Sequence, residues 1–267
     1  MAASPRILAV ANQKGGVGKT TTAINLCAAL VAIGCRVLLI DMDPQGNAST
    51  GLGVPVQKRV RTSYDVLMGD ATIAETVVES SLPNLGLVPG DADLSGVEVE
   101  LGRTIGRAFR LRDAIAASGA MAFDYVLIDC PPSLNLLTVN AFAAADAVLA
   151  PLQCEFFALE GLSQLLRTVE EVRVSLNPRL DLQGVVLTMF DRRNSLANQV
   201  ARDVRAHLKD KVYATPIPRN VRVSEAPSFG LPAIIYDLNC AGSRAYLELA
   251  KEFLARERAA AALEPIS

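Results

Sequence analysis

A short run near the start of the chain combines glycine, lysine and threonine at a spacing that suits phosphate binding: ANQKGGVGKTTTAINL, residues 11–26. Glycines let backbone N–H groups turn toward phosphate oxygens, and the N-terminus of a following helix adds partial positive charge. Lys19 would reach the β- and γ-phosphates of a nucleotide, and the Thr20 hydroxyl would bind Mg²⁺. The residues predicted to hold the nucleotide here are Lys14, Gly15, Gly16, Val17, Gly18, Lys19, Thr20 and Thr21.

This loop departs from the general pattern G-x-x-x-x-G-K-[ST], because Gln13 stands where the first glycine belongs and Lys14 follows it. Lys19 already serves the loop's own nucleotide, so we expect Lys14 to act on a nucleotide held by a second copy of the chain. A lysine that stabilises transition-state charge in trans acts as an arginine finger does. The alternative is that Lys14 is a solvated surface lysine.

The elements that must position this loop are strands and helices in alternation, which predicts an α/β fold with a mostly parallel, twisted sheet and helices on both faces. Short apolar runs predict strands at 6–12, 36–41, 85–90, 124–130, 146–152 and 184–190. Helical spacing predicts helices at 19–33, 94–118, 134–144, 159–176, 195–209 and 242–261, with Gly34 and Gly119 as helix ends. The stretch 46–63 is rich in small and polar residues and predicts a mobile loop.

Composition limits the classes of function. About half of the 267 residues are apolar, which fits one globular domain over 1–267, with a tail at 259–267 that we expect to fray. The net charge of −2 means that any nucleic-acid binding must come from a local patch. The single histidine, His207, excludes multi-histidine metal sites and is expected to be exposed, and the five cysteines lack C-x-x-C spacing and are expected to be reduced core thiols. Without a signal-peptide pattern or a long apolar run, we expect a cytoplasmic protein with no membrane anchor.

Four motifs in order carry a resemblance to a known family: KGGVGKT, then LLIDMDPQGNAST (38–50), YVLIDCPPS (125–133) and IPRNVRVSEAPSFGLP (217–232). With them the chain resembles the ParA/MinD family of deviant Walker A ATPases, and within it the short chromosome-partitioning ParA (Soj-like) branch. The resemblance covers essentially the whole chain and implies a P-loop NTPase fold with ATP and Mg²⁺ as cofactors.

The resemblance assigns separate roles to three carboxylates that follow predicted strands. Asp129 resembles a Walker B aspartate that holds Mg²⁺ directly or through water, although it could instead cap the turn before Pro131. Asp43 is implied to orient the attacking water, with Asp41 supporting the magnesium shell, and the alternative for Asp43 is a plain turn residue. The segments 43–50 and 129–140 would then sense the γ-phosphate.

The resemblance also places Pro218, Arg219 and Asn220 around the adenine, and the alternative there is a turn made rigid by proline. Guanine is not expected, because the N-K-x-D sequence by which related GTPases read that base is absent.

Positive charge gathers between Arg192 and Arg222, where eight basic residues stand against Asp203 and Asp210, a net of +6. Arg193 and Arg222 resemble positions at which this family grips DNA, and Arg202 and Arg205 lie three apart on one predicted helical face. Lys209 and Lys211 complete the predicted DNA-binding set. No recognition motif accompanies the charge, so we expect salt-sensitive phosphate contacts with little base reading. The alternative is an ordinary solvated charge run, and a second basic cluster, KRVR at 58–61, could add to the patch.

These features predict an ATPase for chromosome or plasmid partitioning. Its ATP-bound homodimer would bind double-stranded DNA on the nucleoid and leave it after hydrolysis stimulated by a ParB-type protein. The alternative is a MinD-like membrane ATPase, but the end LAKEFLARERAAAALEPIS lacks the basic and bulky apolar faces of a membrane-targeting helix. An iron–sulfur carrier is a third possibility, for which Cys130 lacks a suitably spaced companion.

Overall fold

The computed structural model describes residues 4–117 and 122–263, and its centre is one sheet. In the described residues the strand order is β3-β4-β2-β5-β1-β6-β7, and all neighbouring strands are parallel except β3 and β4. This confirms the predicted α/β fold with a mostly parallel sheet. The strands are β1 (Arg6–Val10), β2 (Val37–Asp41), β3 (Val78–Glu79), β4 (Leu85–Val88), β5 (Tyr125–Asp129), β6 (Ala147–Gln153) and β7 (Asp181–Thr188).

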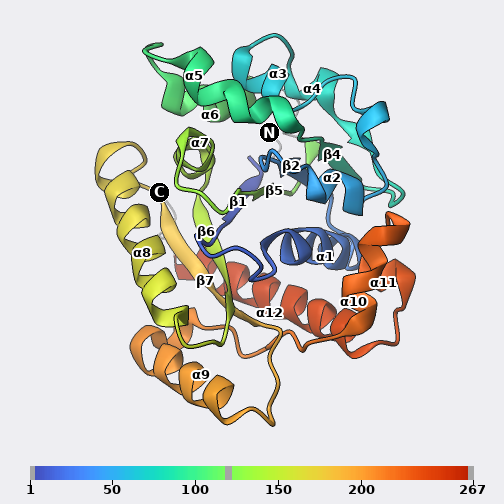
Figure 1. Cartoon of the computed structure of the whole chain (residues 1–267), viewed down its shortest axis with the longest axis vertical. Helices are drawn as coiled ribbons and strands as arrows, with labels where there is room; N and C mark the ends of the chain where they lie inside the picture. Colours follow the sequence, from blue (N-terminus) through green and yellow to red (C-terminus); the bar gives the residue numbers. More distant parts are fainter. Residues whose placement is uncertain (1–3, 118–121, 264–267) are drawn as a thin grey trace.

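Helices cover both faces of the sheet (Figure 1). One layer contains α3 (Ser63–Met68), α5 (Val97–Leu101), α6 (Arg110–Ala117), α7 (Leu136–Ala144), α8 (Ala158–Ser175) and α9 (Ser195–Leu208). The other contains α1 (Lys19–Ala32), α2 (Asn47–Gly51), α10 (Val221–Glu225), α11 (Ala233–Tyr236) and α12 (Ala241–Leu263). The short helix α4 (Ile73–Thr76) follows α3. None of the helices in the described residues combines the length and the apolar character needed to cross a bilayer.

The strand side chains explain the two layers. Leu8 and Val10 of β1 belong to the apolar core that includes α1 and α12, whereas Ala9 between them belongs to the core that includes α7 and α8. Because successive side chains of a strand point to opposite faces, a strand covered on both sides must be apolar throughout. All five residues of β2 are buried, as this requires.

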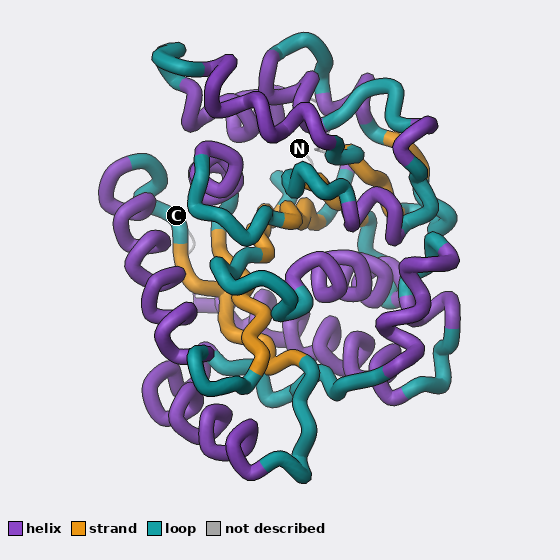
Figure 2. The backbone as a smooth tube through the Cα atoms, viewed as in Figure 1, coloured by secondary structure: helices purple, strands orange, loops and turns teal. Residues whose placement is uncertain are grey.

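The loops at the carboxyl ends of β1, β2 and β5 lie together at one edge of the sheet, as the tube in Figure 2 shows. Asp41 and Asp129 are register partners at that edge, where β2 and β5 end. Open α/β sheets bind their ligands at this edge. The fold therefore brings together the glycine-rich loop and the predicted carboxylates.

Several predicted boundaries differ from the structure. The single helix predicted at 94–118 is wrong, because Gly102 and Gly106 adopt positive φ values of 39° and 78° and separate α5 from α6. The stretch 46–63 holds α2 and a 3-10 turn at Val56–Lys58, where a loop without structure was expected. Gly34 ends α1 with φ 103°, as predicted, whereas Gly119 lies outside the described residues.

The C-terminal helix α12 extends through Leu263, into the stretch 259–267 that was predicted to fray, and residues 264–267 lie outside the described part. His207 is exposed, as expected. All five cysteines are free thiols; three of them are buried and Cys35 and Cys240 are half-buried.

Candidate functional site

The loop between β1 and α1, which we call the phosphate loop (residues 12–19), wraps the N-terminus of α1. Gly16 and Gly18 adopt left-handed backbone conformations with φ of 74° and 86°, a region that favours glycine. At the end of β7 the Thr188 hydroxyl donates a 2.7 Å hydrogen bond to the Val17 carbonyl and fixes the loop against the sheet. The first backbone N–H groups of α1 have no intrahelical acceptor, so they are free to bind phosphate oxygens.

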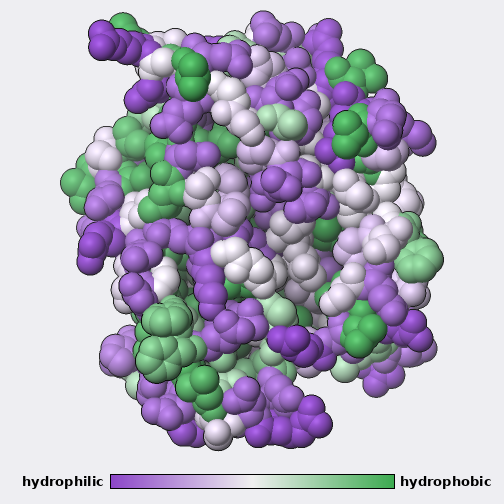
Figure 3. Space-filling model, in the orientation of Figure 1, coloured by the Kyte–Doolittle hydropathy of each residue, from purple (hydrophilic) through white to green (hydrophobic). Residues whose placement is uncertain are grey.

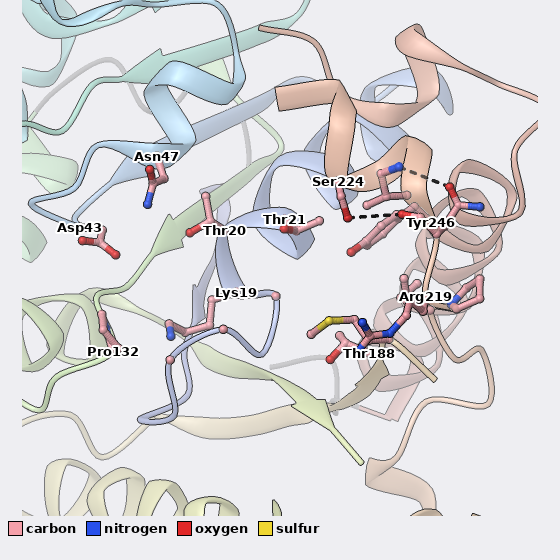
Figure 4. Close-up of a pocket in the computed structure, with 18 of the residues that line it drawn as sticks. Lys19, Thr20, Thr21, Asp43, Asn47, Pro132, Thr188, Arg219, Ser224 and Tyr246 are labelled. Atoms are coloured by element: carbon pink, nitrogen blue, oxygen red, sulfur yellow. Dashed lines mark hydrogen bonds between the residues drawn. The ribbon is translucent and has the colours of Figure 1, made fainter. Parts of the chain in front are cut away.

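A pocket of about 440 Å³ opens at this loop, a volume in the range of small-ligand sites. Asp43, Asn47 and Pro132 lie at one end of it, beyond Lys19 and Thr20 (Figure 4). The other end is formed by Arg219, Ser224 and Tyr246, with Thr188 nearby (Figure 4). The arrangement suits a phosphate chain at the first end and a base and sugar at the second.

Ten of the predicted site residues line this pocket: Gly15, Gly16, Gly18, Lys19, Thr20, Thr21, Asp43, Pro218, Arg219 and Asn220. Four others do not line it. Val17, Asp41 and Asp129 are buried, and Lys14 points elsewhere.

Of the other lining residues, Gln45, Asn47 and Pro132 fall in the segments 43–50 and 129–140 that were predicted to sense the γ-phosphate. Sequence reasoning did not name the rest: Thr188, Met189, Ile217, Val223, Ser224 and Tyr246. Thr188 lies inside the strand predicted at 184–190, and it is the last residue of β7 in the structure. Tyr246 had no local sequence signal, because it belongs to α12, far from the phosphate loop in sequence. The fold brings it to the site, where its hydroxyl lies 3.3 Å from that of Thr22.

Lys19 is 6% exposed, and burial lowers the pKa of its ammonium, against the opposing charges of Asp129 and Asp43. Its Nζ donates a 3.2 Å hydrogen bond to the Lys14 carbonyl. An ammonium carries three donors, so this cation still has donors for phosphate oxygens.

Asp129 is fully buried, and neither of its carboxylate oxygens accepts a hydrogen bond from the residues that the structure describes. Burial, reinforced by the charge of Asp41, raises the pKa of this carboxyl well above its usual range. The Thr20 hydroxyl lies near the Asp129 carboxyl but forms no hydrogen bond with it. An unpaired buried carboxylate is costly unless a cation compensates it.

The donor set at this point fits Mg²⁺. Thr20 and Asp129 offer a hydroxyl and a carboxylate, the hard oxygen ligands that Mg²⁺ prefers. Among the described residues no group of three or more histidine, cysteine, aspartate or glutamate side chains could hold a metal. A magnesium ion here would therefore take most of its ligands from phosphate oxygens and water, as this cation commonly does.

Asp41, the neighbour of Asp129, accepts hydrogen bonds on both of its carboxylate oxygens. Its Oδ2 accepts hydrogen bonds from the backbone N–H and the hydroxyl of Ser49, at 2.9 and 2.7 Å, and its Oδ1 accepts one from the Asp43 N–H at 3.2 Å. Burial raises its pKa to about 6, against the lowering effect of these bonds. Asp41 thus acts as a brace behind Asp43 through its hydrogen bond to the Asp43 N–H, and its implied support of the magnesium shell stays a prediction.

Asp43 begins a tight turn that we call the Asp43 turn (residues 43–46). The Gly46 N–H donates to the Asp43 carbonyl at 2.8 Å, and the Gln45 N–H donates to Asp43 Oδ1 at 3.0 Å. The other carboxylate oxygen of Asp43 accepts no hydrogen bond from a residue in the described part of the chain. The side chain faces the same end of the pocket as Lys19 (Figure 4).

Lys14 lies on the outer side of the phosphate loop. Its ammonium forms a 2.7 Å ion pair with Glu155, which follows β6, and its side chain is 35% exposed. The buried amide of Asn12 accepts from the Lys14 N–H at 3.0 Å and donates to the Pro151 carbonyl at 2.8 Å. Lys14 is therefore held near the loop but outside the pocket of its own chain.

The predicted basic residues fall into two groups. Arg192, Arg193 and Arg219 line a hollow beside the nucleotide pocket, and Arg192, Arg202 and Arg205 line an adjoining one. At the lower edge of the molecule hydrophilic side chains are numerous, and over α9 they are mixed with apolar ones (Figure 3). Arg193 is 91% exposed and pairs with its neighbour Asp191 at 2.8 Å.

The other predicted members lie apart from these hollows. Arg222 pairs with Glu225 at 3.0 Å, and Lys211 pairs with Asp181 at 2.8 Å. Lys209 stands at the far end of α9, and a helix of 14 residues spans roughly 21 Å. Arg59 of the KRVR cluster turns inward to backbone carbonyls, whereas Lys58 and Arg61 of the same cluster are exposed.

Comparisons with known proteins show the family of the chain. The chain matches the AAA domain family over residues 5–182. It is 68% identical over 260 residues to the chromosome partitioning protein ParA of Caulobacter vibrioides strain NA1000, with 97% of each chain covered. It is 52% identical to the sporulation initiation inhibitor protein Soj of Bacillus subtilis strain 168, covering 94% of this chain and 98% of that protein.

Among solved structures, cobyrinic acid a,c-diamide synthase from Mycobacterium smegmatis with bound ATP analog and magnesium is 39% identical. It superposes with a TM-score of 0.82, and the match covers 96% of this chain and 97% of that one. A plasmid partition protein from Borrelia burgdorferi is 25% identical, with a TM-score of 0.76 and coverage of 95% and 100%. The chain therefore belongs to the ParA/MinD family, as a chromosome-partitioning ATPase of the ParA/Soj type.

Proposed function

We propose that this partitioning ATPase works as a switch on DNA: two ATP-bound copies form a dimer that binds the nucleoid, and hydrolysis stimulated by a ParB-type protein releases it. The observation that carries this proposal is the position of Lys14. Lys14 belongs to the phosphate loop, but its ammonium lies outside the pocket of its own chain. This ammonium can therefore contact the nucleotide of a facing subunit.

Within one subunit, ATP occupies the pocket with its phosphates on the phosphate loop and its adenine near Pro218, Arg219 and Asn220. Lys19 neutralises charge on the β- and γ-phosphates, and Thr20 and Asp129 hold Mg²⁺. Bound Mg²⁺ supplies further neutralising charge to the same oxygens. The similar synthase from Mycobacterium smegmatis was solved with an ATP analog and magnesium, which supports ATP and Mg²⁺ as the bound molecules here.

Asp43 orients the water that attacks the γ-phosphate. Its side chain lies at the phosphate end of the pocket and keeps one oxygen without a fixed protein partner. Replacing Asp43 with Ala should slow hydrolysis by about 100-fold or more while ATP still binds, so the variant should accumulate as an ATP-bound dimer. Single-turnover hydrolysis with a radiolabelled nucleotide measures this, and turnover at the wild-type rate would refute the role.

DNA binding rests on the hollows lined by Arg192, Arg193 and Arg219 and by Arg202 and Arg205. Contacts to phosphates bind without base reading and weaken steeply as salt rises. One patch binds weakly, but a dimer carries two on one rigid body, and their effective concentration multiplies the affinity. ATP thereby controls attachment to DNA. The names of the Caulobacter and Bacillus relatives, which share far more of the sequence than the synthase does, favour this function over a biosynthetic one.

The test is a titration of double-stranded DNA with the protein in ADP, in ATP and in a slowly hydrolysed analogue, at two salt concentrations. Tight, salt-sensitive binding is expected only with ATP or the analogue. Arg193→Glu should lose DNA binding while the ATP-dependent dimer persists. The matched control is Lys251→Glu, which reverses a charge in an exposed ion pair with Glu248 on α12 and should keep DNA binding. Equal binding in ADP and ATP would contradict the proposal. Nucleotide-dependent binding to anionic vesicles without binding to DNA would favour the MinD-like alternative.

A further inference from the structure

Arg59 connects three separate stretches of backbone around the Asp43 turn. Its Nη1 donates to the Gly90 carbonyl at 2.8 Å, and its Nη2 donates to the Gly46 carbonyl at 3.1 Å. Its Nε donates to the Val54 carbonyl at 3.1 Å, and its Nη2 also reaches the Thr50 hydroxyl at 2.8 Å. The side chain is half-buried and lies outside the nucleotide pocket.

The guanidinium packs directly against Gly46, the last residue of the turn that Asp43 begins. A Cβ added at Gly46 would overlap Arg59 Nη1 and would come within 2.8 Å of the Gly90 carbonyl. Gly46 also closes the turn through its N–H bond to the Asp43 carbonyl. A shift of Arg59 is therefore passed to Asp43 through one short, hydrogen-bonded turn.

Gly90 links the same guanidinium to the brace on the other side of the turn. The Gly90 N–H donates to the Ser49 hydroxyl at 3.0 Å, and that hydroxyl donates to Asp41 Oδ2 at 2.7 Å. Asp41 in turn holds the Asp43 N–H. The Asp43 turn is thus fixed at its start by Asp41 and at its end by Arg59, and both supports meet at Gly90.

We propose that Arg59 is a positioning residue for ATP hydrolysis, which holds the Asp43 turn so that the Asp43 carboxylate meets the attacking water. This inference rests on the proposed role of Asp43. Arginine is required because its planar guanidinium presents five N–H donors in fixed directions and can reach separate carbonyls at once. A lysine ammonium is a single point and cannot span them.

The test compares Arg59→Gln and Arg59→Lys with the control Arg61→Gln. Arg61 is in the same segment, but its exposed side chain pairs with Glu75 away from the turn. The single-turnover hydrolysis rate, measured at saturating Mg²⁺ with the protein in excess over ATP, should fall by about 10- to 100-fold in both Arg59 variants, as a small misplacement of a catalytic group causes. ATP affinity, measured by equilibrium binding, should stay near the wild-type value, and the lysine should not rescue turnover. Thr50→Val removes one of the guanidinium's partners, a hydroxyl that also donates to the Gly46 carbonyl at 3.2 Å, and should give a smaller loss.

Two results would overturn the proposal: wild-type turnover in Arg59→Gln or Arg59→Lys, or a loss of ATP affinity and melting temperature that accounts for all of the lost turnover. If the Arg59 variants do not fold, Thr50→Val decides, and wild-type turnover in that variant refutes the role. Failure of the proposed function has a different result, because it shows in the wild-type protein as a missing ATP-dependent dimer or DNA complex.

Discussion

The inner and outer sides of the phosphate loop each carry a lysine, and the two lysines have opposite surroundings. Lys19 on the inner side is 6% exposed, faces the buried carboxylates and has a lowered pKa because of its burial. Lys14 on the outer side is 35% exposed and pairs with Glu155 at the surface. One loop thus holds one cation deep in the site and another at its rim.

The difference shows how a single loop can serve two nucleotides. A buried cation among buried carboxylates is fixed where it stands, because moving it would leave uncompensated charge. An exposed ion pair contributes only about 0–1 kcal/mol, so Lys14 can leave Glu155 for a more strongly charged partner at little cost. The inner side is therefore suited to binding and chemistry within the chain, and the outer side to assembly.

The largest expected effect lies on the inner side. Lys19→Ala removes the cation that contacts the phosphates and should lower ATP affinity on the order of 100-fold or more. Titration with a fluorescent ATP analogue measures this, with Lys14→Ala as the matched control that should retain binding. If both variants bound ATP equally well, the division between the two sides would be wrong.

The second-largest effect is expected at Asp129, because its two carboxylate oxygens lack hydrogen-bond partners in the described part of the chain and are the predicted ligands of a cation. Asp129→Asn should lower the hydrolysis rate about 10²- to 10³-fold and remove most of the dependence of nucleotide affinity on Mg²⁺. Chelation of Mg²⁺ should bring wild-type turnover down to the level of this variant. A variant that still responds to Mg²⁺ as the wild-type protein does would show that the metal is held elsewhere.

Asp41 should act on folding more than on binding. Asp41→Asn leaves the Ser49 donors without a carboxylate and should cost about 1–3 kcal/mol of unfolding free energy. The raised pKa of about 6 also gives a pH dependence: the folded protein keeps a proton that the unfolded chain releases. The stability linked to this proton is therefore fully present below about pH 4 and is lost as the pH rises through about 6.

Denaturant unfolding of wild-type protein and Asp41→Asn across this range measures both effects. The wild-type advantage over the variant should shrink between about pH 4 and pH 6 and then stay level. A constant difference would mean that Asp41 titrates normally in the folded protein.

The smallest expected effect is on the outer side. Glu155→Gln frees Lys14 from its surface ion pair and should strengthen the ATP-bound dimer by no more than about fivefold. Analytical ultracentrifugation across a concentration series measures this. The control Glu170→Gln breaks another exposed pair, with Arg173 on α8. A weaker dimer in Glu155→Gln would show that Glu155 takes part in the contact between subunits.

The sequence was enough to predict the strands and the phosphate loop, because apolar runs and glycine spacing are local signals. All six predicted strands exist, but β3 was missed, since its two residues become a strand only by pairing with β4. The helices α2, α10 and α11 are too short to show helical periodicity.

The fine structure of the site depends on contacts between distant parts of the chain. Lys14 and Glu155 are 141 residues apart in sequence and meet because β1 and β6 are neighbours in the sheet. Among the described residues Asp41 accepts hydrogen bonds and Asp129 does not, because Ser49 lies beside Asp41 only. Neither difference has a signal in residue type or spacing.

The most direct test of the account is the oligomeric state of wild-type protein and Lys14→Ala, saturated with Mg²⁺ and a non-hydrolysed ATP analogue, by sedimentation velocity. We predict a dimer for the wild-type protein, and a monomer with bound nucleotide for the variant. A wild-type protein that stays monomeric, or a variant that dimerises as well as wild type, would contradict it.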